Sequence, residues 1–166
     1  TILWSATRGI PADYVAPGAP LSERFCIVNA VAGLNAGAYA YERTRHALGR
    51  LAAGEFRRDA GHLGLGQALP AEAAFDVFWL TDLHPVLARF GNRGYRAAQL
   101  EAAIEAGKSY LAAYAIGLGA TGLTFFDDDV IRFFAPHAAG RSVMFLMAFG
   151  RPQRDGCTAL RKQNRR

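Results

Sequence analysis

The glycines of the sequence GLGATG have the spacing of a dinucleotide-binding fingerprint, G-x-G-x-x-G, at Gly117, Gly119 and Gly122. That fingerprint holds a pyrophosphate where a strand enters the glycine turn and a helix leaves it. Here a long helix-like segment enters the glycines and a strand-like segment follows. We therefore expect Gly117 or Gly119 to end a helix in the left-handed conformation, and we expect no Rossmann-type site. Gly122 lies within the predicted strand, where glycine often marks the close approach of a ligand or another backbone.

The acidic triplet Asp127–Asp129 could bind a hard cation, because such ions take clustered carboxylates. A helix start explains the triplet better, since Asp127 or Asp128 can cap the helix while the other carboxylates complement its dipole. We therefore predict an aspartate N-cap and no metal site.

Other residue types that carry out catalysis are dispersed along the chain. The sequence has no H-x-x-x-H, C-x-x-C or G-x-S-x-G motif, and nothing points to Ser/His/Asp chemistry. The histidines occur singly, at His46, His62, His84 and His137. We therefore predict no catalytic side chain: either a cofactor carries the chemistry or the protein is not an enzyme.

Length and composition indicate a single ordinary domain. The chain has 166 residues, of which 51% are hydrophobic, and this is enough for one core. No apolar run approaches the roughly 20 residues needed to span a bilayer, and no signal-like N-terminus is visible. We expect a soluble, cytoplasmic protein that does not bind membranes. The two cysteines, Cys26 and Cys157, are expected to be free thiols.

The excess positive charge lies entirely at the C-terminal end. Residues 151–166 carry five arginines and one lysine against one aspartate, whereas basic and acidic residues balance in the preceding 150 residues. We predict one domain over residues 1–150 and a basic tail over 151–166. Such a tail can meet nucleic acid, membrane phosphates, an acidic partner or a cofactor phosphate, or it can be a solvated end. We expect no nucleic-acid binding, because the domain has no basic stripe with interleaved aromatic residues.

Hydrophobic periodicity predicts how these residues are positioned. The longest periodic segment, residues 95–118, is apolar on more than one face, as is typical of a helix in a core or a subunit interface. Strands are predicted at 24–31, 38–43, 47–54, 73–81, 120–125 and 141–150. Helices are predicted at 1–8, 55–67, 82–91, 95–118 and 127–136, with residues 9–21 as a loop.

A set of short motifs follows one another in a fixed order through the second half of the chain. They are Arg93–Arg96, Leu100–Ala102, Leu111–Ala113, Gly117–Ala120, Phe126–Asp128 and Gly150–Pro152. Together with the hairpin-like sequence RFCIVNAVAGLNAGAYAYE at residues 24–42, this set resembles the flavin-dependent nitroreductase-like superfamily. The resemblance is closest to the branch that includes azoline dehydrogenases, and it covers about residues 22–152.

The resemblance implies an α+β fold with a central, mostly antiparallel sheet flanked by helices, and an intertwined homodimer that binds FMN at its interface. It implies hydride transfer between NAD(P)H, flavin and a small organic acceptor. The acceptor could be a nitro compound, a quinone, an azoline or an unsaturated ring. Flavin N5 carries this chemistry, so no side chain needs to act as a nucleophile.

The resemblance also implies site residues. Backbone groups of Gly122, Leu123 and Thr124 would lie against the isoalloxazine ring. Arg161 and Lys162 would reach the FMN phosphate. Basic residues that are alternatives for the phosphate, or that could help to form the site, are Arg151, Arg154, Arg165, Arg93 and Arg96.

The chain departs from the family pattern at two places. The N-terminal R-x-S-x-R element, which supplies major FMN contacts in the family, does not occur, and we expect N-terminal truncation to be the cause. Gly107–Lys108 replaces the Gln-Asn of many relatives. The alternative hypothesis is therefore a non-catalytic relative that keeps the scaffold as a binding or assembly module.

Overall fold

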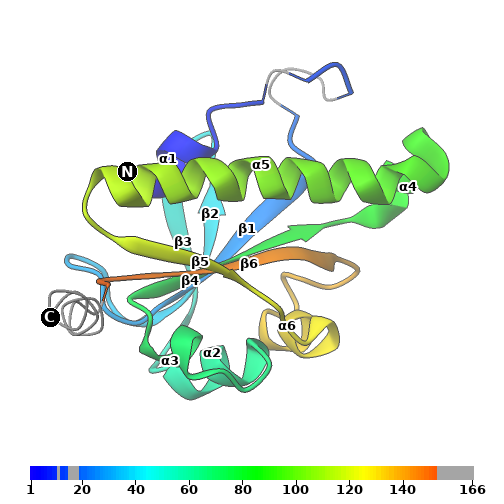
Figure 1. The fold of residues 1–166 in the computed structure, drawn as a ribbon. Coiled ribbons are helices and arrows are strands. Elements are labelled where there is room, and N and C mark those ends of the chain that lie inside the picture. The colour runs from blue at the N-terminus through cyan, green and yellow to red at the C-terminus, as the bar shows by residue number, and fades with distance from the viewer. Residues whose placement is uncertain (11, 15–18, 153–166) are drawn as a thin grey trace, which may run out of the picture.

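A computed structural model describes residues 1–10, 12–14 and 19–152. Six strands form one antiparallel sheet in the order β3-β2-β1-β4-β6-β5 (Figure 1). The strands are β1 Ser22–Val28, β2 Gly37–Glu42, β3 Ala47–Ala53, β4 Phe75–Thr81, β5 Gly119–Leu123 and β6 Ser142–Gly150. The α-helices are α1 Ile2–Ala6, α2 Arg57–Leu63, α3 Ala68–Glu72, α4 Leu83–Phe90, α5 Gly94–Ala115 and α6 Asp127–Phe133. A single 3₁₀ turn, Gly91–Arg93, joins α4 to α5. The predicted α+β class with a mostly antiparallel sheet is confirmed.

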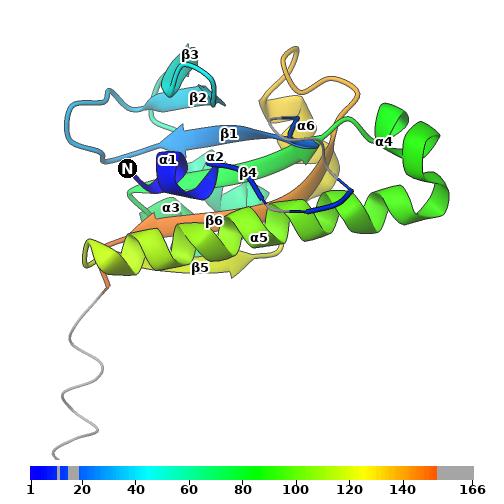
Figure 2. The ribbon, with the colours of Figure 1, turned by 90° about the horizontal axis from the view of Figure 1, so that it is seen from above.

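The helices cover both faces of the sheet. Helices α1 and α5 lie on one face, and α2, α3 and α6 lie on the other (Figures 1 and 2). Side chains alternate along β4, so that Trp79 packs in the α5-side core while Phe78 packs with Phe134 in the other core. Strand β4 is therefore buried on both faces, which explains why most of its residues are apolar, Asp76 excepted, rather than alternating with polar ones.

Buried carboxylates attach α5 to the sheet. Glu105 accepts hydrogen bonds from Trp79 Nε1 at 2.9 Å and Arg24 Nε at 2.7 Å, and Arg24 Nη2 donates to its other oxygen. One helical turn earlier, Glu101 accepts from the backbone N–H of Ser22 at 2.8 Å and of Leu21 at 2.9 Å. Burial raises the pKa of Glu101, although the hydrogen bond from Leu21 opposes this shift. These contacts connect one face of α5 to the start of β1 and to β4.

Small residues on the same face of α5 allow close packing. Ala98, Ala102, Ala106 and Ala113 are fully or almost fully buried in the α5-side core. The prediction of one long helix is confirmed, with one of its faces buried in the core, and the predicted way in which it ends is confirmed too. Gly117, just beyond the helix, has φ +75°, which is the left-handed conformation predicted for Gly117 or Gly119.

The predicted aspartate N-cap of α6 is wrong. The N-cap is Phe126, whose backbone N–H donates to the carbonyl of Leu63 at the end of α2. This contact makes Phe126 the N-cap, so the helix begins at Asp127 and all three aspartates lie in its first turn. Asp129 then pairs with His62 Nε2 at 2.6 Å and with Arg132 at 2.5 Å. Helix α3 was not predicted as a separate element, because its five residues are too short for a periodic pattern.

Some predictions concern parts of the chain that lie outside the described residues. These include the basic tail beyond residue 152, with Arg154, Cys157, Arg161, Lys162 and Arg165, so the boundary at 150/151 stays a prediction. Within residues 1–10, 12–14 and 19–152, no helix is both long and apolar enough to cross a membrane.

Candidate functional site

Strand β5 lies at one edge of the sheet and contains two of the three residues predicted to contact a flavin ring. Its partner is β6, and no other described strand pairs with its outer side. The hydroxyl of Tyr110, on the last part of α5, accepts a hydrogen bond of 2.7 Å from the N–H of Gly122. The last turns of α5 therefore hold the backbone of β5 at Gly122.

The close approach that explains Gly122 comes from a side chain. A Cβ on Gly122 would lie 3.0 Å from Cζ and 3.1 Å from Cε1 of Phe145, on the neighbouring strand. A glycine at this position leaves room for the Phe145 ring, which also packs against Trp79 at 6.2 Å between ring centroids. The packing within the protein is therefore sufficient to account for this glycine, and a ligand is not needed.

The neighbouring residues differ in exposure. Leu123 is partly buried against the core on the α2 and α6 side, whereas Thr124 is exposed just after the strand. Gly150 pairs with Gly119, so Arg151 lies near the other end of β5, and it is exposed. A strand rises about 3.3 Å per residue, so Arg151 and Thr124 are separated by roughly 17 Å. The structure does not bring these two together.

The two arginines at the beginning of α5 are also remote from β5. Arg93 ends the 3₁₀ turn and Arg96 lies in the first turn of α5, and both are exposed. Arg96 and Tyr110 are 14 residues apart on one helix, which corresponds to about 21 Å.

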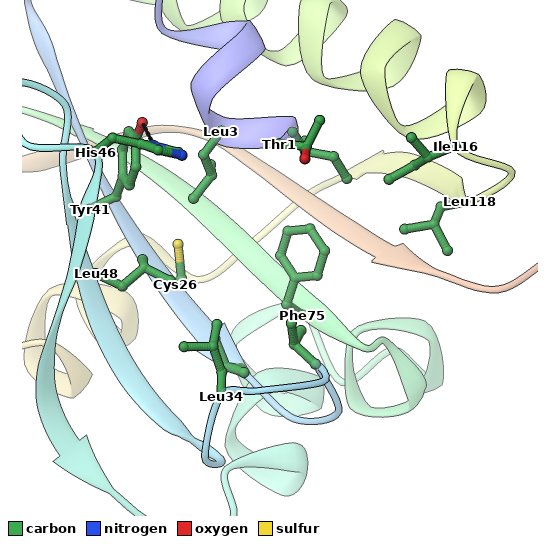
Figure 3. A pocket seen from close by; sticks show the side chains of 13 residues that line it. Thr1, Leu3, Cys26, Leu34, Tyr41, His46, Leu48, Phe75, Ile116 and Leu118 are labelled. Carbon is green, nitrogen blue, oxygen red and sulfur yellow. Dashed lines mark hydrogen bonds between the residues drawn. The ribbon is translucent and has the colours of Figure 1, made fainter.

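A cavity of about 520 Å³ opens on the α5-side face of the sheet (Figure 3). Its walls come from α1, from β1 and the segment that follows it, from the β2–β3 hairpin, from the start of β4, and from the segment between α5 and β5. Its apolar lining includes Leu3, Val28, Leu34, Leu48, Phe75 and Leu118. Leu118 directly precedes β5.

Four of the lining residues carry polar side-chain groups, namely Thr1, Cys26, Tyr41 and His46. Tyr41 hydrogen-bonds through its hydroxyl to His46 Nδ1 at 2.8 Å, and the thiol of Cys26 is buried. Burial raises the pKa of Cys26 to about 12, with a smaller contribution from Asp76. None of the described residues that line the cavity is a lysine or an arginine.

Comparison with known proteins decides the family. Residues 23–151 match the sequence pattern of the Nitroreductase family. The chain belongs to the Nitroreductase family. No curated protein matches it.

Solved structures agree with this family. A protein of Anabaena variabilis described as a nitroreductase is 35% identical with a TM-score of 0.76, over 80% of this chain and 27% of that one. A chain in the E. coli microcin synthetase McbBCD complex has 22% identity and a TM-score of 0.72, over 92% of this chain and 62% of that one. A Ralstonia eutropha protein described as a nitroreductase has 16% identity and a TM-score of 0.71, over 92% of this chain and 70% of that one. The chain thus spans about a quarter of the Anabaena protein and under two thirds of the E. coli chain.

The described residues of this Nitroreductase-family chain fit the two parts of FMN unequally. A flat ring needs backbone groups and apolar surface. The outer side of β5 pairs with no other described strand, although the N–H of Gly122 is already bonded to Tyr110. A phosphate needs cations, and the excess positive charge lies in residues 151–166, mostly outside the described part. The ring portion fits the described residues, and the phosphate portion depends on that tail.

Sequence reasoning missed Tyr110 and the cavity. The contact of Tyr110 with Gly122 requires knowledge of how α5 packs on β5, which no local pattern contains. A weak signal was available, because Tyr110 directly precedes the family-like segment Leu111–Ala113.

Replacing Tyr110 by phenylalanine is expected to lower the free energy of unfolding by about 1–2 kcal/mol, because the N–H of Gly122 loses its acceptor in a partly buried place. Urea denaturation measures this change. Tyr114→Phe is the matched control, since Tyr114 is 59% exposed, and it should change stability by less than about 0.5 kcal/mol. Equal effects of the two substitutions would contradict a specific role of the Tyr110 hydroxyl.

Proposed function

We propose that this protein is an FMN-dependent oxidoreductase that transfers a hydride between NAD(P)H, flavin and a small organic acceptor. The observation that carries the proposal is the family match over residues 23–151, which includes all of β5, with Gly122 and Leu123, and Thr124 just after it. The family is one of oxidoreductases, and in the described part of the chain no group of three or more histidine, cysteine, aspartate or glutamate residues could hold a metal ion for another chemistry.

The chain's own residues would bind and orient the cofactor. The backbone of Gly122, Leu123 and Thr124 would hold the ring, and Tyr110 would fix the position of that backbone. Arg161 and Lys162 in the basic tail would neutralise the phosphate, which carries close to two negative charges at neutral pH. When bound, FMN would supply the hydride acceptor and donor at N5, so the protein needs only to position the ring, exclude water and stabilise negative charge.

The outward face of α5 supports a homodimer. Leu100, Leu111 and Tyr114 are 51%, 71% and 59% exposed. Their spacing of 11 and then 3 residues places them along one face of the helix. An apolar stripe on a long helix is suited to a symmetric contact with the same stripe on a second copy. Dimerisation through α5 would also place residues of the second copy near the unpaired edge of β5.

Equilibrium titrations with FMN and with riboflavin, which lacks the phosphate, test this proposal. We expect the protein produced from its complete reading frame to bind FMN at least tenfold more tightly than riboflavin, since a charge-assisted phosphate contact contributes at least 1.4 kcal/mol. Replacing both Arg161 and Lys162 by glutamine should reduce the FMN affinity toward that of riboflavin. The same variant should leave riboflavin binding unchanged.

A double variant with equal charge change provides the control. Arg45→Gln with Arg58→Gln removes two exposed arginines from the β2–β3 hairpin and from α2, and it should leave both affinities unchanged. Absence of flavin binding in the folded protein would contradict the proposal. Equal loss of FMN binding in both double variants would contradict the assignment of Arg161 and Lys162.

The alternative is a non-catalytic scaffold or binding module. The scaffold hypothesis expects a stable dimer in sedimentation that binds no flavin. The oxidoreductase hypothesis expects a stable dimer that binds flavin.

A further inference from the structure

The cavity and the predicted flavin contacts are separate places in the molecule. Leu118 lines the cavity, and Gly122 lies four residues further along an extended strand, about 13 Å away. Gly122, Leu123 and Thr124 are not among the lining residues. A molecule in the cavity therefore need not be the flavin, nor in contact with it.

The walls of the cavity suit an uncharged apolar molecule. Aliphatic and aromatic side chains from five segments of the chain enclose it, with Phe75 and Leu118 at one end (Figure 3). The buried Cys26 thiol faces the cavity and stays protonated, because burial raises its pKa to about 12. A charged ligand would lose its hydration there without gaining a partner of opposite charge.

The opposite end of the cavity offers hydrogen bonds. Tyr41 and His46 lie together there, joined at 2.8 Å, and the Tyr41 hydroxyl is also 3.4 Å from Thr7 Oγ1 (Figure 3). His46 has φ +50°, and its ring packs at 4.9 Å from Trp4 and 5.7 Å from Tyr41. The β2–β3 turn and these two rings thus hold the imidazole in place before any ligand arrives.

We propose that this cavity binds a small, uncharged ring compound that carries one hydroxyl or carbonyl group, with the ring against Phe75 and Leu118 and the polar group at Tyr41 and His46. The volume of about 520 Å³ is within the range of small-molecule sites. A mostly apolar pocket with a few polar groups at one end is the usual arrangement for binding and orienting such a molecule. The site is independent of the proposed flavin binding.

Titration with 2-naphthol and naphthalene, followed by amide NMR shifts in the absence of flavin, tests the proposal. These probes share one ring system and differ by a single hydroxyl. We expect 2-naphthol to bind saturably with one equivalent and to shift the amides of Val28, Leu48 and Leu118. We expect naphthalene to bind at least fivefold more weakly.

Three variants locate the site. Leu34→Trp places a large side chain at the cavity from a loop position that is 37% exposed, and it should weaken 2-naphthol binding at least tenfold. Leu69→Trp, at a 48% exposed position on α3 outside the cavity, is the matched control and should change the affinity less than twofold. Tyr41→Phe should retain naphthalene binding and lose most of the preference for 2-naphthol.

The same titrations can overturn the proposal. No saturable shift in the unsubstituted protein, shifts confined to β5, or unchanged affinity in Leu34→Trp would each contradict a ligand site in this cavity. A preference for 2-naphthol that survives in Tyr41→Phe would contradict the assignment of the polar end. Because no flavin is present, failure here is distinct from failure of the proposed oxidoreductase function, and dispersed amide spectra confirm that each variant is folded.

Discussion

Replacing Glu105 by alanine is expected to lower the free energy of unfolding by about 3–5 kcal/mol. Arg24 and Glu105 are both about 3% exposed, and Glu105 also accepts the indole N–H of Trp79. Alanine at position 105 would leave the guanidinium of Arg24 buried without a carboxylate and the indole without an acceptor. Guanidinium chloride denaturation measures the effect, with the slope checked for two-state behaviour.

Two further variants distinguish the effect of losing the Arg24–Glu105 ion pair from the effect of disturbing the packing of the core. The double variant Arg24→Met with Glu105→Leu should recover most of the lost stability, because matched apolar residues remove both buried charges together. Arg45→Ala breaks the exposed pair with Glu42 and should change stability by at most about 1 kcal/mol. If Glu105→Ala does not fold, Glu105→Gln gives the same comparison with less loss of packing. A single-variant loss below about 1 kcal/mol would contradict the importance of this pair.

Stability is expected to fall as the pH rises from about 4 to about 8, because of Asp76. Its side chain is fully buried in β4, and neither carboxylate oxygen has a hydrogen-bond partner among the residues that the structure describes. Burial raises the pKa of Asp76 to about 8, although the nearby charge of Arg57 opposes the shift. The folded protein therefore keeps a proton that the unfolded chain loses near pH 4. The stabilisation is complete below that pH and is lost as the pH rises through about 8.

Asp76→Asn tests this pH dependence by removing the charge while keeping the shape. Each pH unit in this window should change the stability difference between the two proteins by up to about 1.4 kcal/mol, on the order of 5 kcal/mol in total. The asparagine variant should be the more stable one at pH 8. Asp59→Asn, at an exposed position of α2, is the control and should keep the original slope. Identical slopes for the Asp76→Asn variant and the original protein would contradict a buried, protonated Asp76.

Much of the fold could be predicted because its elements have local signals. The apolar residues of 73–81 indicated a strand. Asp82, the first residue of the helix predicted over 82–91, caps α4 by accepting from the His84 N–H at 3.0 Å. The length and periodicity of residues 95–118 indicated α5. These features depend on residues close together in sequence, so the pattern contains them.

The contacts that fix α5 could not be predicted, because they join distant parts of the chain. The periodicity of the helix suggested apolar faces, yet its inward face includes Glu101 and Glu105. Their partners in and before β1 lie about 80 residues away in sequence. A glutamate on an apolar helix face looks unfavourable until the arginine that neutralises it is known.

The candidate site was predicted only in part for the same reason. The sequence indicated that Gly122 needs a close neighbour, but only the pairing of β5 with β6 identifies this neighbour as Phe145. The cavity is assembled from segments as distant as Leu3, Leu48 and Leu118, each of which is an unremarkable apolar residue in its own context. The flavin-contact residues came from the family resemblance, and they stay predictions.

The most direct test of the central claim is the visible spectrum of FMN bound to the folded protein. The protein is produced from its complete reading frame, and the spectrum is recorded without oxygen while NADH or NADPH is added. The proposed oxidoreductase predicts that the absorbance of the bound, oxidised flavin is bleached by one nicotinamide equivalent and returns when an acceptor is supplied. A folded dimer that binds no FMN, or that binds FMN which neither nucleotide bleaches, would contradict the claim and favour the scaffold.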